Sequence, residues 1–160
     1  MTGTSFSTSF TVDRTPDEVF DAVTDVRRWW MTKIDGDNRA VGDEFSFRVP
    51  DVHSCTMRVT ELVPGEKVVW QVVDNHMTFI EDQSEWMGTE IRFELSPTDG
   101  GTELRFTHDG LVPTYECFDI CRNAWNFYVG DSLRSLAATG EGKPSDPGTL
   151  SLGEEAARVG

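Results

Sequence analysis

A long amphipathic segment near the C-terminus limits the folds that this 160-residue chain can adopt. Between residues 114 and 139, apolar side chains recur every three or four positions, as on one face of a helix: Phe118, Cys121, Trp125, Val129, Leu133 and Leu136. Gly140 follows, at a place where glycine favours the end of a helix. The pattern predicts one long helix whose single apolar face needs a large partner surface to cover it.

Most of the chain before this helix alternates between polar and apolar residues, which indicates β-strands. A helical block from Thr15 to Trp30 interrupts the alternation, and it begins with a hydroxyl cap followed by Pro16 at the first helical position. The strand-like runs cover residues 6–12, 44–49, 57–63, 67–73, 87–95 and 102–109. This order predicts an α+β fold in which a curved, mainly antiparallel sheet wraps around the long C-terminal helix.

The length of the chain and its breaker residues predict one domain with a short extension. A chain of 17.9 kDa has room for one well-buried core, which we assign to residues 1–142. Residues 143–160 are expected to form a flexible tail, because the run from Gly140 to Gly148 is rich in Gly and Pro. The polar stretch 74–85 is expected to be a mobile connection.

The charge of the chain disfavours whole classes of partner. Fourteen basic against 28 acidic side chains leave a net charge of −14, which repels nucleic acids and anionic membrane surfaces. No run approaches the roughly 20 apolar residues of a membrane helix, and the N-terminus lacks the features of a secretory signal. With only three cysteines, Cys55, Cys117 and Cys121, a reduced, cytoplasmic location is expected.

No spacing of cysteines and histidines in the chain indicates a metal site, and no motif indicates a cofactor. Neither Cys-x-x-Cys nor His-x-x-x-His occurs, and no glycine-rich phosphate loop follows a strand. We therefore expect neither a metal nor a cofactor. A Gly-x-Ser-x-Gly nucleophile motif is also missing.

Large aromatic residues, together with a few other side chains, are predicted to face the space between the sheet and the helix. Strand parity and helix spacing place ten side chains around that space: Phe45, Phe47, Met57, Trp70, Phe93, Phe106, His108, Phe118, Cys121 and Trp125. These side chains either form a well-packed core or line a cavity that holds a small hydrophobic or aromatic ligand. Composition alone does not decide between the two.

His108 is the candidate polar residue in this space. It shares strand parity with Leu104 and Phe106, so it is expected to face inward near the end of its strand. One interpretation is a buried histidine satisfied by a hydrogen bond. The other is a group that orients a ligand or serves as a general base, since its ordinary pKa lies near neutrality. Asp109 is expected to point the opposite way, which weakens a His–Asp pair.

Several segments together resemble the START-like (SRPBCC) superfamily. Residues 10–24 with Arg28-Trp29-Trp30 are similar to its opening, and residues 88–95, 101–111 and the helix carrying Cys121, Trp125 and Ser132-Leu133 are similar to its branch related to activators of the Hsp90 ATPase. The Thr-His-x-Gly-Leu stretch at 107–111 is the most distinctive part. The resemblance covers about residues 5–142 and implies a helix-grip fold that encloses a hydrophobic cavity. It also implies a binding role, since members bind lipids, sterols, polyketides and plant hormones.

Three functions follow from these observations. The leading hypothesis is a binding module for a small hydrophobic or aromatic metabolite, held between sheet and helix. The resemblance also allows an enzyme of the polyketide cyclase or dehydratase kind, with His108 as acid or base. The acidic surface allows a protein-interaction module of the co-chaperone kind. A homodimer of two chains is compatible with each of these functions.

Overall fold

A computed structural model describes residues 5–49, 53–77, 86–111 and 118–144 of the chain. The strands are β1 (Phe6–Val12), β2 (Asp35–Gly36), β3 (Glu44–Val49), β4 (His53–Val63), β5 (Lys67–Met77), β6 (Glu90–Thr98) and β7 (Gly101–Asp109). The helices are α1 (Pro16–Thr24), the 3₁₀ turn Val26–Arg28, α2 (Phe118–Phe127), a π-helical segment Tyr128–Leu133 and α3 (Arg134–Thr139).

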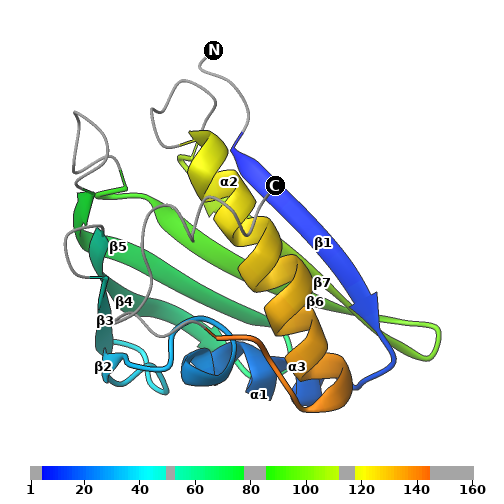
Figure 1. The fold of residues 1–160 in the computed structure, drawn as a ribbon. Coiled ribbons are helices and arrows are strands. Elements are labelled where there is room, and N and C mark those ends of the chain that lie inside the picture. The colour runs from blue at the N-terminus through cyan, green and yellow to red at the C-terminus, as the bar shows by residue number, and fades with distance from the viewer. Residues whose placement is uncertain (1–4, 50–52, 78–85, 112–117, 145–160) are drawn as a thin grey trace.

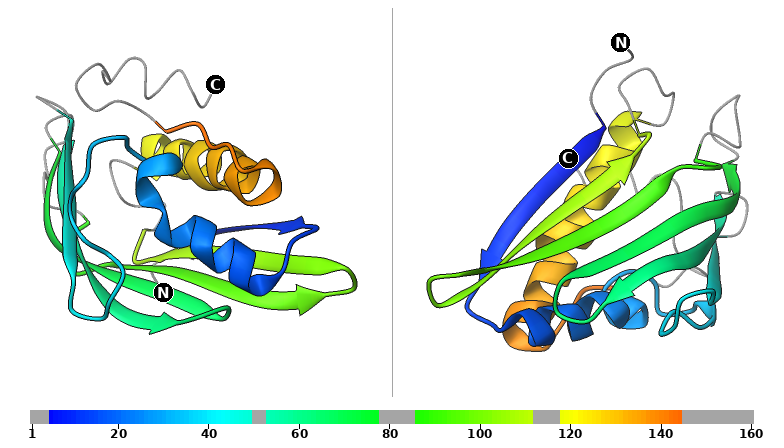
Figure 2. Two further views of the ribbon diagram at one scale, coloured as in Figure 1. Left: turned by 90° about the horizontal axis from the view of Figure 1, so that it is seen from below. Right: turned by 180° about the vertical axis from the view of Figure 1, so that it is seen from behind.

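The strands form one antiparallel sheet in the order β1-β7-β6-β5-β4-β3-β2. The first strand therefore lies beside the last, with Phe6 opposite His108 and Val12 opposite Thr102. The C-terminal helix crosses one face of this sheet (Figure 1), and the sheet curves around the helical side (Figure 2). This arrangement confirms the predicted α+β helix-grip fold.

Two irregularities in the pairing of β4 with β5 accompany the curvature. One register shift lies between Thr56 and Met57, opposite the extra residue Val73, and a second lies between Val59 and Glu61. An extra residue in one strand bends the sheet and increases its twist. It also reverses which side chains face inward beyond that point. The sequence predicts a mobile connection over the stretch 74–85, but its first part, up to Met77, belongs to strand β5. Residues 78–85 lie outside the described residues.

Helix α1 begins where the sequence predicts a start. The Thr15 side chain accepts a hydrogen bond from the Glu18 backbone N–H, and the Glu18 carboxylate accepts one from the Thr15 backbone N–H. This reciprocal capping box satisfies two backbone donors that a helix start otherwise leaves free. The helix buries Val19 and Val23 and leads through the 3₁₀ turn to Trp29.

The C-terminal helix differs from the regular helix that the sequence predicts, because the π-helical segment Tyr128–Leu133 lies between α2 and α3. In this segment the Ser132 hydroxyl donates to the Trp29 carbonyl at 2.7 Å and accepts from the Lys143 backbone N–H at 2.7 Å. Ser132 thus joins the helix both to the segment after α1 and to the first residue of the expected tail. Residues 145–160 of that tail lie outside the described residues.

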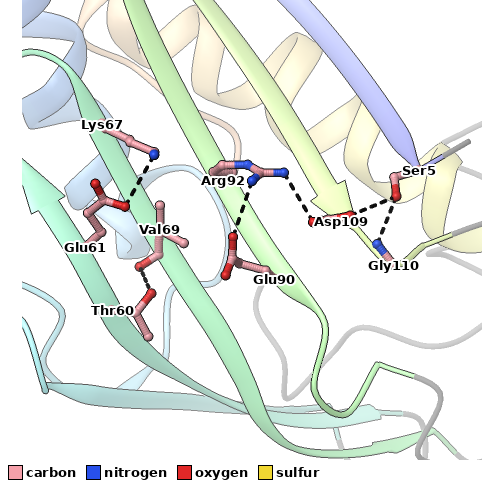
Figure 3. A network of polar contacts seen from close by, with 9 residues as sticks. All are labelled: Ser5, Thr60, Glu61, Lys67, Val69, Glu90, Arg92, Asp109 and Gly110. Carbon is pink, nitrogen blue, oxygen red and sulfur yellow. Dashed lines mark hydrogen bonds and ion pairs between the residues drawn. The ribbon is translucent and has the colours of Figure 1, made fainter.

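The outer face of the sheet carries alternating charges (Figure 3). Arg92 forms ion pairs with Glu90 at 3.5 Å and with Asp109 at 3.4 Å, while Lys67 pairs with Glu61 at 3.3 Å. These half-exposed contacts keep that face hydrated and oppose non-specific pairing of sheets. None of the helices in the described ranges is long and apolar enough to cross a membrane.

Candidate ligand-binding interior

The structure brings the ten predicted lining residues together between the sheet and α2. All of them except Phe118 are buried, and Phe118 is half-buried at the start of α2, with the Arg122 guanidinium 5.9 Å from its ring centre. Residues of the α1 side join them, because Trp29 and Trp30 are also buried in the same cluster. The predicted positions therefore share one aromatic interior.

The rings of this interior contact one another in a continuous network. Trp30 lies at its centre, stacked on Trp70 at 6.0 Å and on Trp29 at 5.9 Å, and tilted against Trp125 at 5.1 Å and Phe47 at 4.9 Å. Aromatic pairs at these separations contribute about 0.5–1.5 kcal/mol each beyond the area that they bury. The same rings that stabilise the core thus provide flat surfaces on which another ring could stack.

A second part of the interior contains polar groups, which we call the histidine cluster: His53, Asn75, Trp86, Thr89 and His108. All five residues are buried. They come from the ends of β4, β5 and β7 and from the turn that precedes β6. Buried polar groups are costly unless hydrogen-bonded, so their partners decide what the cluster can do.

His108 takes part in a chain of hydrogen bonds whose direction is fixed. The indole Nε1–H of Trp125 can only donate, so Nδ1 of His108 accepts it, at 3.1 Å. The neutral ring then carries its proton on Nε2 and donates to the Thr89 hydroxyl oxygen at 2.8 Å. That hydroxyl donates to the Trp86 carbonyl at 2.5 Å. Both ring nitrogens are therefore engaged, and His108 holds the Trp125 ring in place.

Gly110 allows this chain of hydrogen bonds to form at the end of β7. A Cβ atom at this position would lie 2.7 Å from Cγ2 of Thr89, and the backbone φ of 106° favours glycine. The side chain of Thr89 can therefore approach His108 only because residue 110 lacks a side chain. This gives a physical reason for the Thr-His-x-Gly part of the resemblance.

His53 forms the second polar contact of the cluster. Its Nε2–H donates to Oδ1 of Asn75 at 2.6 Å, across the pair of strands β4 and β5. Burial is the main cause that lowers the pKa of His53 to about 4, and burial likewise lowers the pKa of His108 to about 3. Both imidazoles are therefore neutral at physiological pH, and the cluster carries no net charge.

Trp86 lies between the two histidines. Its ring centre is 5.0 Å from that of His53 and 4.7 Å from that of His108, both edge-on, and it stacks on Trp125 at 5.7 Å. The indole Nε1–H groups of Trp86 and Trp70 are buried and have no hydrogen-bond partner in the described part of the chain. Within the described residues, the aromatic interior thus contains two donors without acceptors.

Other features of the described residues offer less to a ligand or metal. Three open hollows of about 300–480 Å³ surround Arg14 on the outside of the molecule, and none of the predicted lining residues borders them. No three His, Cys, Asp or Glu side chains within the described ranges come together as metal ligands. Burial, followed by the charge of Asp74, raises the pKa of the Cys55 thiol, which makes it a poor nucleophile.

Sequence reasoning missed four members of the histidine cluster. His53 shares inward parity with Cys55 and Met57, so strand alternation could have placed it. Asn75 could not be placed in this way, because the extra residue Val73 reverses the parity of β5 beyond Val72. Thr89 shares inward parity with Ile91 and Phe93 in the predicted run 87–95, so alternation could have placed it as well. Trp86 precedes that run and lies in a turn, where no periodic pattern applies.

The comparisons with known proteins agree with the fold. The family model described as "Activator of Hsp90 ATPase homolog 1-like protein" matches residues 13–138. No curated protein matches the chain. Among solved structures, the Aha1 dimer from Colwellia psychrerythraea is 26% identical, with a TM-score of 0.71 over 87% of this chain and 99% of that one.

Two further structures share the fold at lower identity. CalU16 from Micromonospora echinospora is 18% identical, with a TM-score of 0.61 over 84% of this chain and 76% of that one. DynU16, from the dynemicin biosynthetic locus, is 17% identical, with a TM-score of 0.61 over 85% of this chain and 48% of that one. Similarity at this level concerns the fold alone.

Proposed function

Because the chain belongs to the family of Activator of Hsp90 ATPase homolog 1-like proteins, we propose that its interior binds a small, uncharged aromatic metabolite. The site lies between the curved sheet and α2, where the ten predicted lining residues meet the histidine cluster. The ligand would stack on the tryptophan rings and direct an oxygen atom toward an indole N–H. No metal or cofactor takes part in this proposal.

The observation that carries the proposal is the pair of buried indole donors. The Nε1–H groups of Trp70 and Trp86 have no acceptor among the described residues. A buried donor without a partner costs about 1–3 kcal/mol, and proteins rarely retain such groups without a reason. Binding removes this cost where a carbonyl, ether or hydroxyl oxygen of the ligand accepts from the indole, or where the ring turns so that water accepts instead.

The charge of the interior supports an uncharged ligand. The lowered pKa values of His53 and His108 leave both rings neutral, and the other side chains of the interior are apolar, aromatic or, like Asn75 and Thr89, polar without charge. An ionised ligand would lose its hydration without gaining an opposite charge in return. Flat rings match the stacked geometry of Trp29, Trp30 and Trp70.

A panel of oxygen-bearing aromatic compounds tests the proposal on the whole protein. Each compound, such as a naphthol or a flavonoid, is compared with a saturated analogue of similar size. A true ligand at 100 times its Kd is expected to raise the Tm by about 5–10 °C, and the saturated analogue by much less. If no compound raises the Tm or changes the tryptophan fluorescence, the proposal is wrong.

Trp70→Phe provides a control variant for the same panel. It keeps a ring in the core but removes one of the two indole donors that lack an acceptor among the described residues. Ligands whose oxygen reaches Trp70 are expected to bind this variant roughly tenfold more weakly, which corresponds to one hydrogen bond of about 1.4 kcal/mol. Trp29→Phe is the matched comparison, since the Trp29 N–H already donates to the Val23 carbonyl at 3.1 Å.

A catalytic role for His108 has less support than binding. In the structure, Nδ1 accepts a hydrogen bond from Trp125 and the opposite nitrogen donates to Thr89. No lone pair on the ring is therefore free to take a proton from a ligand. A cyclase or dehydratase that used His108 would first have to break the contact with Trp125. Turnover that is lost in His108→Gln while ligand affinity is kept would favour the enzymatic role.

We also propose that two copies of the chain pair, since the 26% identical protein from Colwellia psychrerythraea is described as a dimer. The edge strand β1 pairs only with β7 among the described strands and has no charged residue or proline. Such an edge is open to pairing with another strand. Light scattering of the wild-type protein is expected to give twice the mass of one chain. The variant Ser9→Pro is expected to give the mass of a monomer.

A further inference from the structure

We propose that the indole of Trp86 occupies the ring-binding position of the ligand, and that this side chain rotates out when the ligand enters. The inference rests on the proposed function and names the place within the interior where binding occurs. It concerns one side chain of the histidine cluster and the turn that carries it.

The surroundings of the Trp86 ring form a ready-made slot for an aromatic molecule. The two histidines contact it edge-on, with interplanar angles of 90° for His53 and 86° for His108. Trp125 forms the floor, nearly parallel to the Trp86 ring at 14°. The hydrogen bond from Trp125 to His108 holds these two rings in position independently of the Trp86 side chain, and His53 is held by its contact with Asn75.

The described residues provide no polar anchor for the Trp86 side chain in this slot. The two other interior tryptophans with described indole contacts donate their Nε1–H groups, Trp29 to the Val23 carbonyl and Trp125 to His108. The Trp86 Nε1–H is buried and has no acceptor among the described residues. If the side chain rotated into solvent, its Nε1–H would donate a hydrogen bond to water. The outward position therefore gains a hydrogen bond that the described residues do not provide in the inward position.

The backbone of Trp86 is held by hydrogen bonds, in contrast to its side chain. Its carbonyl accepts hydrogen bonds from both the backbone N–H and the hydroxyl of Thr89, at 3.0 and 2.5 Å, which closes a four-residue turn. Gly88, with a φ of 81°, donates from its backbone to Val72 at 2.9 Å and ties this turn to β5. The adjacent Met87 is half-exposed, so the turn borders solvent. The indole can therefore leave by rotation about its own side-chain bonds.

The size and charge of the slot define the ligand class. A ligand that replaces an indole has about two fused rings and lies flat on Trp125. It is uncharged, because His53 and His108 are neutral and buried. We therefore expect a fused-ring aromatic compound, with indole and 2-naphthol as suitable probes.

Removal of the side chain tests the slot directly. Trp86→Ala is expected to bind indole with 1:1 stoichiometry and at least tenfold more tightly than the wild type, as apolar cavities in protein cores do. Bound indole should show nuclear Overhauser effects to the rings of Trp125 and His108. Trp86→Phe, which keeps the slot filled, should gain no affinity. A folded Trp86→Ala protein that binds no indole, or binds it elsewhere, would overturn the inference.

Fluorine NMR on the wild-type protein tests the movement, and it does not depend on the stability of the alanine variant. With 5-fluorotryptophan incorporated, Trp→Phe variants assign the resonances. A ligand from the aromatic panel should move the fluorine chemical shift of Trp86 to the value of a solvent-exposed 5-fluorotryptophan. The chemical shift of Trp29 should change little. A bound ligand that leaves Trp86 buried would refute this inference but not the proposed function. A panel without any ligand would refute the proposed function, whatever Trp86→Ala binds.

Discussion

The two ends of the C-terminal helix meet the rest of the protein through different kinds of contact. At the end of α3, the Arg14 guanidinium donates to the Ala138 carbonyl at 2.8 and 3.2 Å, and the Thr102 hydroxyl donates to the Arg14 carbonyl at 2.7 Å. We call this region, with the Thr15–Glu18 capping box, the capped end. In α2, about two turns after its first residue, Trp125 faces the histidine cluster instead.

The difference concerns how polar groups are satisfied. At the capped end, side chains complete the backbone hydrogen bonds of helix ends, which stabilises the fold and leaves no need for a ligand. The histidine cluster has two buried imidazoles that must stay neutral and a buried indole donor for which the described part of the chain offers no acceptor. Groups that lower stability gather at functional sites, so the comparison favours the histidine cluster as the place of binding.

The largest expected effect compares two tryptophans. Trp29→Ala should lower the free energy of unfolding by about 3–5 kcal/mol, because a fully buried ring and its hydrogen bond to Val23 are lost. The loss of unfolding free energy in Trp86→Ala should be smaller by about 1 kcal/mol or more, because a donor without a partner among the described residues is removed together with the ring. Urea unfolding measures both. Equal losses would remove the distinction between the two sites.

Acid should destabilise the protein through the histidine cluster. Folding lowers the pKa values of His53 and His108 from 6.5 to about 4 and about 3, so the unfolded chain binds protons more readily. Stability is therefore lost as the pH falls below 6.5, by roughly 3–4 kcal/mol between pH 7 and pH 5 for the two groups together. Unfolding by urea at each pH measures the loss.

His108→Gln separates this effect from the titration of carboxylates. The glutamine keeps a donor and an acceptor but cannot be protonated, so about half of the histidine-dependent loss should disappear. An unchanged dependence on pH in this variant would show that His108 is not the buried, neutral group described above.

A matched pair of conservative changes compares a satisfied donor with a free one. Trp29→Phe and Trp70→Phe remove the same atoms from two fully buried tryptophans. Of the two indoles, only that of Trp29 has a hydrogen-bond partner among the described residues, so Trp29→Phe breaks a bond and leaves the Val23 carbonyl without this donor. Trp29→Phe should therefore be less stable than Trp70→Phe by about 1 kcal/mol, as judged from urea midpoints. The reverse order would contradict the assignment of the free donors.

The smallest expected effect concerns the capped end. Thr15→Ala removes the hydroxyl that accepts from the Glu18 backbone, which should cost about 1 kcal/mol of stability and leave ligand affinity unchanged. Thr11→Ala, at an exposed position on β1, serves as the control and should change stability by less than about 0.5 kcal/mol. Altered ligand affinity in Thr15→Ala would place the binding site at the capped end.

The sequence predicts those parts of the molecule whose positions follow a regular period. Phe45, Phe47 and Phe106 alternate along strands, and Cys121 and Trp125 recur on a helix, so all of them could be placed in the interior. Asn75 escapes prediction because the extra residue at Val73 reverses the alternation of β5. The Trp86 ring escapes because only the folded turn directs it between the two histidines.

Nuclear Overhauser effects between a ligand from the aromatic panel and the wild-type protein test the central claim most directly. Binding inside the protein predicts contacts from the ligand ring to the rings of Trp125 and His108. Contacts only to residues around Arg14, on the outside of the molecule, would contradict it.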